Sequence, residues 1–157
     1  YGSSTKYHHE YLGTNSRLDE LQASFLRHKL RKLQGDNEIR RRIAQRYLTE
    51  IRNPHIVLPY PTLDLSKQLE SVFHIFPVFS QHRRKLQEYL RERAIETLIH
   101  YPIPIHKQLC FRHLWKDKKS CLNAEQLANE ELSLPISPVL SDEHVIRVIR
   151  ALNTFEP

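Results

Sequence analysis

The residues around the start of the first predicted helix could bind an anion. Asn15 and Ser16 stand beside the expected helix N-terminus, and either side chain can cap it. An amide N–H at this place is also a good anion donor, because the free backbone N–H groups of a helix start attract negative charge. Arg17 opposes the helix macrodipole there, which favours an anionic partner. Plain helix capping beside a surface arginine is the alternative interpretation.

A second group of candidate residues comes at the end of a predicted strand. His100 and Tyr101 directly precede Pro102, and a side chain at the end of a rigid element can line a binding site. A half-buried strand end is the alternative. Two histidines and two cysteines follow nearby, at His106, His113, Cys110 and Cys121. Their spacing matches no ordinary zinc pattern, so we predict no metal site.

The elements that must position these residues begin with two helices. Apolar residues recur at steps of three and four from Leu18 to Leu33 and again from Ile39 to Ile51, which is the helical period. We expect Ser16 to cap the first helix and residues 35–37, which begin with a glycine, to break or bend the run. Asn53 and Pro54 stop the second helix.

The remainder predicts a small sheet flanked by helices. The expected strands are 72–79, 96–101 and 132–136, and the expected helices are 81–93, 124–131 capped by Asn123, and a last one capped by Ser141. Pro77 cannot donate to a ladder, so its strand should lie at an edge or be bulged. The fold class is therefore α+β with a small antiparallel sheet. We place an interface or linker segment at residues 1–53 and a small domain at residues 54–157.

Composition limits the classes of function. The 157 residues are 39% hydrophobic and carry a net charge of +6, which is compatible with a core and with nucleic acids, anionic membranes or phosphorylated small molecules as partners. No apolar run reaches the roughly 20 residues of a membrane span. Arg40, Arg41, Arg42 and Arg46 predict a solvated face, because no aromatic interleaving accompanies them. The chain begins at Tyr1 and has no methionine, so we expect a processed or excised piece.

Several ordered blocks resemble one known family. Residues 13–23 read GTNSRLDELQA, similar to the G-x-N-x-R-L-D-E-L-Q-A signature of the DegT/DnrJ/StrS family of sugar aminotransferases. Lys6 to His9 precede this block at the usual distance. Residues 97–108, TLIHYPIPIHKQ, and 124–136, AEQLANEELSLPI, resemble two further blocks in the same order. The resemblance covers nearly the whole chain.

The resemblance implies a fold, a reaction and a set of partners. The chain is expected to be the C-terminal small domain of an aspartate-aminotransferase-type enzyme that uses pyridoxal phosphate. The parent is expected to transfer an amino group from an amino acid, glutamate in the first instance, to a nucleotide-linked keto-sugar. Such enzymes serve amino-sugar, lipopolysaccharide or antibiotic-sugar biosynthesis, and we expect a cytoplasmic homodimer with reduced cysteines.

The resemblance also implies roles for individual residues. Asn15 and Arg17 are expected to hold the cofactor phosphate in the neighbouring subunit. Lys6, Tyr7 and His8 are expected to contact the pyrophosphate of the nucleotide-sugar, and His100 and Tyr101 to line the substrate edge of the site. No residue of this chain is assigned a catalytic role.

The family's cofactor-binding lysine lies upstream of the signature, and so does the aspartate that pairs with the pyridine nitrogen. Neither block is present here, so we expect the isolated chain to be inactive. The residue that separates aminotransferases from the family's dehydratase-like members is also upstream, which leaves that choice open. The alternatives are a basic binding or regulatory module for nucleic acid, and a degenerate, truncated gene product.

Overall fold

The chain folds as two compact units. The computed structural model describes residues 3–5, 8–14, 17–59, 71–111 and 121–157. Contacts group residues 1–35 in one unit and residues 36–157 in the other. Residues 36–53 therefore pack with the second unit, because Ile43 and Tyr47 are buried in its core.

The first unit begins with a short hairpin and continues into a helix. Strand β1 (Ser3–Thr5) pairs antiparallel with β2 (His8–His9), and helix α1 covers Glu20–Leu30. Asp19 is the N-cap of α1, because its carboxylate accepts a hydrogen bond from the backbone N–H of Gln22 at 2.8 Å. The cap therefore lies three residues later than the Ser16 cap expected from sequence.

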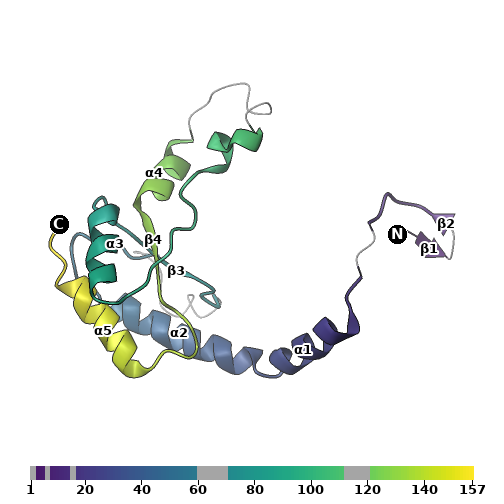
Figure 1. Cartoon of the computed structure of the whole chain (residues 1–157), viewed down its shortest axis with the longest axis horizontal. Helices are drawn as coiled ribbons and strands as arrows, with labels where there is room; N and C mark the ends of the chain where they lie inside the picture. The colour runs from purple at the N-terminus through teal and green to yellow at the C-terminus, as the bar shows by residue number, and fades with distance from the viewer. Residues whose placement is uncertain (1–2, 6–7, 15–16, 60–70, 112–120) are drawn as a thin grey trace. The chain divides into compact units, whose positions relative to one another are not determined.

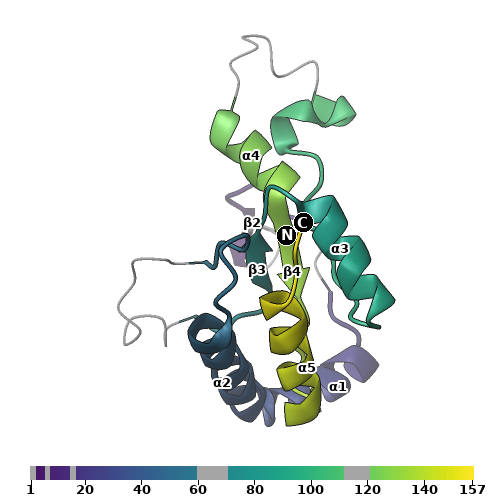
Figure 2. The same ribbon diagram turned by 90° about the vertical axis from the view of Figure 1, so that its left-hand side faces the viewer.

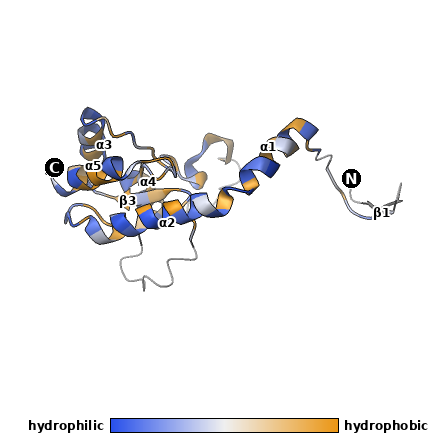
Figure 3. Ribbon diagram, turned by 90° about the horizontal axis from the view of Figure 1, so that it is seen from below, coloured by the Kyte–Doolittle hydropathy of each residue, from blue (hydrophilic) through white to orange (hydrophobic). Residues whose placement is uncertain are grey.

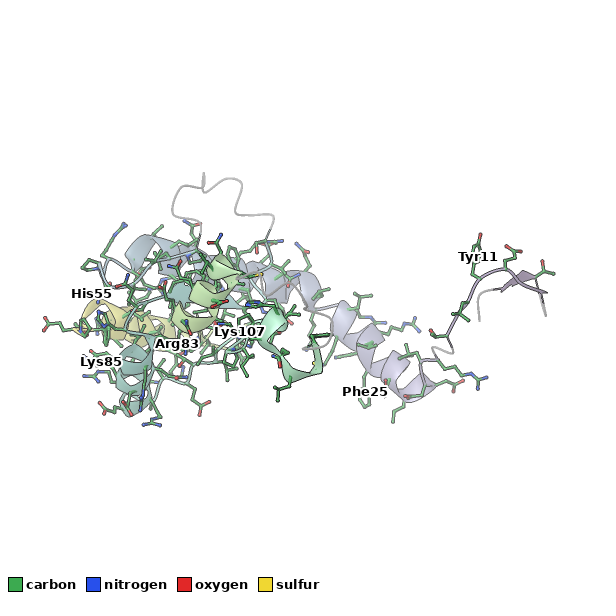
Figure 4. All side chains as sticks on the ribbon, turned by 90° about the horizontal axis from the view of Figure 1, so that it is seen from above. Tyr11, Phe25, His55, Arg83, Lys85 and Lys107 are labelled. Carbon is green, nitrogen blue, oxygen red and sulfur yellow. The ribbon has the colours of Figure 1, made fainter. Side chains whose placement is uncertain are left out.

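Helix α1 exposes its apolar side chains. None of its residues is buried within the described structure, and Phe25 is 63% exposed. Figure 3 shows hydrophobic residues along this helix, and Figure 4 shows Phe25 projecting from it. The periodicity correctly predicted a helix, but among the described residues of this 35-residue unit no second layer covers the apolar side.

The break between the two helices precedes the glycine. Helix α2 covers Leu33–Glu50 and continues through residues 35–37, and the turn lies at Arg31 and Lys32. The backbone N–H of Lys32 donates to the carbonyl of Lys29 and closes the last turn of α1. The break expected at Gly35 was therefore wrong. A single glycine costs a helix only about 1 kcal/mol, and packing of Ile43, Ala44 and Tyr47 outweighs that cost.

The sheet of the second unit is built on two antiparallel strands. β3 (Phe76–Phe79) pairs with β4 (Glu131–Leu134), with Phe76 opposite Leu134 and Pro77 opposite Ser133. Bridges from Val57 to Phe79 and from Leu98 to Ser133 flank the pair. The antiparallel prediction is confirmed, although each strand is shorter than expected. Residue 73 has a positive φ of 47°, which ends the extended backbone before β3.

Pro77 occupies a position where no donor is needed. The N–H and C=O groups of Ser133 bond to Leu98 on the other side of β4. The Pro77–Ser133 pair is therefore a non-hydrogen-bonded pair of the ladder. This explains how a proline is accommodated in a paired strand.

Three further helices complete the second unit. They are α3 (Arg83–Glu92), α4 (Leu122–Glu130) and α5 (Asp142–Asn153), with short 3-10 turns η2 (Ile105–Lys107) and η3 (Leu109–Phe111). Ser141 caps α5 as predicted, accepting from the N–H of His144. Asn123 does not cap α4, because the helix begins one residue before it.

Figures 1 and 2 show α4 at the opposite end of β4 from α5. None of the described helices is both long and apolar enough to cross a bilayer.

The core of the second unit lies on one face of the sheet. Phe76 and Val78 of β3 and Leu132 and Leu134 of β4 share this face by their register, and all four are buried. Helices α2, α3 and α5 and the loops beside them contribute the other buried residues, and those from the helices include Tyr47, Leu86, Leu90, Val145, Val148 and Leu152. The Tyr47 ring packs edge-on to Phe76, and its hydroxyl donates to the carbonyl of Pro135 at 2.8 Å. Burial raises the pKa of this phenol.

Two asparagines tie the end of α2 to the end of α5. The buried amide of Asn53 donates to the carbonyls of Leu152 and Phe155, at 2.8 and 2.7 Å, and its oxygen accepts from the N–H of His55. Asn153 reciprocates by donating to the carbonyl of Glu50. Carbonyls at helix ends lack partners within their own helix, so these amides satisfy both termini at once.

Asn53→Asp is predicted to destabilise the second unit by about 2–4 kcal/mol. The carboxylate cannot donate, so the carbonyls of Leu152 and Phe155 lose the donor that Asn53 supplies and face a negative charge. Asn123→Asp, an exposed change of the same kind in the first turn of α4, should alter the free energy of unfolding by less than about 0.5 kcal/mol. Urea unfolding followed by circular dichroism measures both. Equal effects of the two substitutions would contradict the role given to Asn53.

Candidate functional site

The face of the β3–β4 sheet that points away from the core carries polar side chains among apolar neighbours. Register places Glu131 opposite Phe79 and Ser133 opposite Pro77, so both side chains point away from the core. Leu98 bridges to Ser133, and His100 follows two residues later on the same face. Glu131 and Ser133 are nevertheless only 4% and 5% exposed.

Hydrogen bonds connect these three polar side chains. Ser133 Oγ donates to Glu131 Oε1 at 2.5 Å, and Ser133 Oγ lies 2.9 Å from His100 Nδ1. The second oxygen of Glu131 accepts the backbone N–H of His100 at 2.6 Å. The His100 ring also meets the Tyr101 ring edge-on, with centroids 5.4 Å apart. Both main chain and ring of His100 are thereby held in place.

Two hollows meet at His100. One, of about 730 Å³, is lined by Pro77, Phe79, Tyr101, Ile105 and Glu131 among others. The other, of about 880 Å³, is lined by Arg84, Arg91, Leu98 and Ser133 among others. His100 lines both. Ligand sites typically combine an apolar lining with a few oriented polar groups, and this place offers that combination.

Glu125 of α4 anchors one wall of the first hollow. Its carboxylate accepts from Lys107 Nζ at 2.5 Å and lies 3.0 Å from His106 Nε2. The hydrogen bond from Lys107, and after it the one with His106, lowers the pKa of Glu125 below its ordinary value. This carboxylate fixes η2 and so holds the segment that carries Ile103 and Ile105.

The residues predicted from sequence are only partly placed. Lys6, Tyr7 and Asn15 lie outside the described residues. His8 lies in β2, paired with Thr5, and Arg17 is exposed just before α1. His100 and Tyr101 are brought together at the first hollow. Of the residues predicted from sequence, the structure thus shows both side-chain contacts and a surrounding hollow for His100 and Tyr101.

The arginines of α2 have partners both within that helix and beyond it: Arg41 also donates to the carbonyl of Ser71, and Arg46 lies 3.7 Å from Asp142. Arg41 pairs with Glu38 at 2.7 Å, and Arg46 makes two hydrogen bonds to Glu50. Arg40 donates to an asparagine one turn earlier. The side chains of Arg41 and Arg46 are 18% and 26% exposed, so this part of the helix is only partly solvated, and the solvated face stays a prediction.

Comparison with known proteins decides the family. The profile of the DegT/DnrJ/EryC1/StrS aminotransferase family matches residues 1–153. The chain belongs to this family.

Individual relatives agree with that assignment. The dTDP-3-amino-3,6-dideoxy-alpha-D-galactopyranose transaminase of Aneurinibacillus thermoaerophilus is 48% identical over 99% of this chain and 41% of its own length. The dTDP-3-amino-3,4,6-trideoxy-alpha-D-glucose transaminase of Streptomyces venezuelae is 40% identical over 99% of this chain and 40% of its own. The chain therefore spans about two fifths of the relatives it matches.

A solved structure shows the same fold. The crystal structure of S. venezuelae DesV in complex with a ketimine intermediate superposes with a TM-score of 0.82 at 40% identity. The alignment covers 98% of this chain and 40% of that one. The small α+β unit is therefore the fold of a segment of a sugar aminotransferase.

The described residues that line the two hollows do not provide all the groups that a pyridoxal phosphate site needs. Pyridoxal phosphate needs a lysine that it can modify and donors for its phosphate. Among the described residues that line the two hollows there is no lysine. Both oxygens of Glu131 are already engaged, by Ser133 and by the backbone of His100. These residues therefore do not form a complete cofactor pocket by themselves.

Sequence reasoning missed Glu131, Ser133 and Glu125. Residues 131–134 read ELSL, and this period-two alternation was visible. It assigns Glu131 and Ser133 to the face opposite the leucines, which would have marked them as polar groups beside the site. Glu125 and Lys107 are 18 positions apart in the sequence. Patterns of helix or strand spacing do not predict a contact over this distance.

Glu125→Gln is predicted to loosen the segment 102–109. Because the pKa of Glu125 is lowered in the folded chain, its contacts are fully present at neutral pH and are lost as pH falls through that lowered pKa. Hydrogen exchange followed by mass spectrometry, with each rate divided by the intrinsic amide rate at the same pH, should show weaker protection of 102–109 in the variant at neutral pH, and in the wild type only under acid conditions. Glu130→Gln removes the same charge from the same helix and should leave this segment unchanged. Unchanged exchange in Glu125→Gln would show that η2 is held by other contacts.

Proposed function

We propose that this chain is the C-terminal part of a pyridoxal-phosphate-dependent aminotransferase that acts on a nucleotide-linked keto-sugar. The observation that carries the proposal is the family match over residues 1–153, together with relatives that are named nucleotide-sugar transaminases. The cofactor, when bound to the complete parent, supplies an electron sink for moving the amino group. The amino donor is an amino acid, glutamate in the first instance.

The names of the relatives suggest the position of the keto group. The two transaminases described above are named for dTDP-linked sugars with the amino group on carbon 3, whereas two less similar relatives are named for UDP-linked sugars. The first of the dTDP-sugar transaminases is nearly half identical to this chain. We therefore assign the parent a dTDP-linked 3-keto sugar as substrate, in amino-sugar biosynthesis for a surface polysaccharide or an antibiotic.

His100 and Tyr101 supply the substrate edge in this proposal. They line a largely apolar hollow, where an imidazole and a phenol can bond to sugar hydroxyls while apolar residues meet the sugar ring faces. Asn15 and Arg17 hold the cofactor phosphate of a second subunit, and Lys6, Tyr7 and His8 contact the substrate pyrophosphate. The lysine that binds the cofactor comes from another part of the parent, so this chain alone is inactive.

The uncovered apolar surfaces have a place in the same proposal. Leu21, Phe25 and Leu30 of α1 are each more than 60% exposed, as are Leu98 and Ile105 around the hollows. Apolar patches of this kind mark contact surfaces. The remaining part of the parent and its homodimer partner cover them. The free cysteines Cys110 and Cys121 agree with a reducing, cytoplasmic setting.

The complete parent, loaded with pyridoxal phosphate, is predicted to convert a dTDP-3-keto-6-deoxyhexose and glutamate to the 3-amino sugar and 2-oxoglutarate. Mass spectrometry of both products measures the reaction. The 4-keto isomer should react at least about tenfold more slowly, since a misplaced carbonyl loses about 1.4 kcal/mol or more of transition-state binding. Residues 1–157 alone serve as the control and should not turn over.

Two results would count against this proposal. The absence of an amino sugar from either ketone, with the cofactor bound and several amino donors tried, would overturn the aminotransferase function. Faster reaction of the 4-keto isomer would overturn the assignment to carbon 3 while leaving the reaction class intact.

A further inference from the structure

We propose that Glu131 is a positioning residue which determines, through Ser133, the ring nitrogen of His100 that carries the proton. The consequence for substrate binding rests on the proposed function, but the hydrogen-bond relay itself does not. The proposal assigns a task to a buried carboxylate that lies next to the substrate edge and is not needed for the core.

The relay begins at the carboxylate. Glu131 is 4% exposed, and its two oxygens accept from different donors, Ser133 Oγ at 2.5 Å and the backbone N–H of His100 at 2.6 Å. A carboxylate has acceptor sites only. The hydrogen in the contact between Glu131 and Ser133 therefore comes from the serine.

The direction of the hydrogen bond from Ser133 to Glu131 fixes the direction of the hydrogen bond between Ser133 and the imidazole of His100. A serine hydroxyl has one hydrogen, and Ser133 has already given it to Glu131. Toward His100 Nδ1, at 2.9 Å, its oxygen can only accept. Nδ1 must therefore carry a hydrogen, and in the neutral ring the lone pair is on Nε2.

Nε2 is then available to a ligand. Within the described part of the chain, the hydrogen bonds of the His100 ring involve Nδ1 alone, and the residue lines both hollows. The edge-on ring of Tyr101 restricts rotation of the imidazole. The relay thus presents an oriented acceptor, which selects a hydroxyl donor such as that of a sugar.

The substitution Glu131→Gln distinguishes control of the His100 tautomer from a role of Glu131 in the fold alone. The backbone N–H of His100 can only donate, so it must take the single acceptor oxygen of the amide. The amide NH₂ then faces Ser133 and donates to it. The serine hydrogen is released toward Nδ1, which becomes the acceptor, and the ring proton moves to Nε2. The side chain keeps its size, so packing is preserved while the tautomer is reversed.

The test uses the complete parent enzyme with its cofactor and with ¹⁵N-labelled histidine. Long-range ¹H–¹⁵N correlation spectra, recorded where the ring is neutral, report which nitrogen bears hydrogen, and His100→Gln identifies the His100 signals. We expect hydrogen on Nδ1 in the wild type and on Nε2 in Glu131→Gln. The neighbouring variant Glu130→Gln, which removes the same charge at a partly exposed position, should keep the wild-type pattern. Hydrogen on Nε2 in the wild type, or the same tautomer in wild type and Glu131→Gln, would overturn the proposal.

Kinetics provide a second readout. In Glu131→Gln, kcat/KM for the keto-sugar should fall by about tenfold to a hundredfold, since a hydrogen bond to an oriented acceptor is lost. The half-reaction with the amino donor should be unchanged. Ser133→Thr retains the hydroxyl and should retain the wild-type tautomer and most of the activity. An equal loss in both half-reactions would indicate a general structural defect and would contradict the proposal.

A variant that fails to fold and a parent enzyme that lacks transaminase activity have different consequences for the proposal. If Glu131→Gln does not fold, Ser133→Ala replaces it, and there the preference for hydrogen on Nδ1 should be lost; a retained preference would overturn the relay. If the parent shows no transamination at all, the proposed function fails, whereas the tautomer of His100 still decides for or against the relay.

Discussion

The antiparallel register of β3 and β4 is the constraint on which both faces of the sheet depend. It places Leu132 and Leu134 with Phe76 and Val78 in the core, and Glu131 and Ser133 on the other face. A slip by one residue would exchange the faces, bringing a carboxylate into the core. The Leu98 bridge then adds a third segment beside Ser133, which carries His100 to the same face.

As a consequence of this arrangement, helices cover one face of the sheet, while apolar side chains near the other face stay exposed. The core side is closed by α2, α3 and α5, whereas Leu98 and Tyr101 on the other side remain 66% and 74% exposed. Exposed apolar groups beside a buried polar network are a poor design for a surface in water. They are reasonable for a surface that forms part of a larger active site, which agrees with relatives more than twice as long as this chain.

The fold was largely predictable because local chemistry and packing agree. Ser141 caps α5, and β3 lies within the range 72–79 where a strand was expected, as the sequence indicated. Prediction failed where a tertiary contact outweighed a local preference. Gly35 sits inside a helix whose later turns are buried, and α4 begins before Asn123, the residue expected to cap it.

The site was less predictable, because its geometry depends on contacts distant in sequence. His100 and Tyr101 could be found from the strand end and the family resemblance. Their supports could not, since Ser133 is 33 residues from His100. Only the register of β4 against its neighbours brings the two together.

The presence of Glu131 in this register favours a role in function over one in stability. Removing a carboxylate from water costs several kcal/mol, and replacing buried charged groups by apolar ones is often neutral or stabilising. Two hydrogen bonds, each contributing roughly 1.5–3 kcal/mol when one partner is charged, offset that cost without a clear surplus. An apolar residue at position 131 would pack against Phe79 and maintain the sheet. What it could not do is accept from Ser133 and from the backbone of His100 together, and these two contacts orient the imidazole toward the hollows.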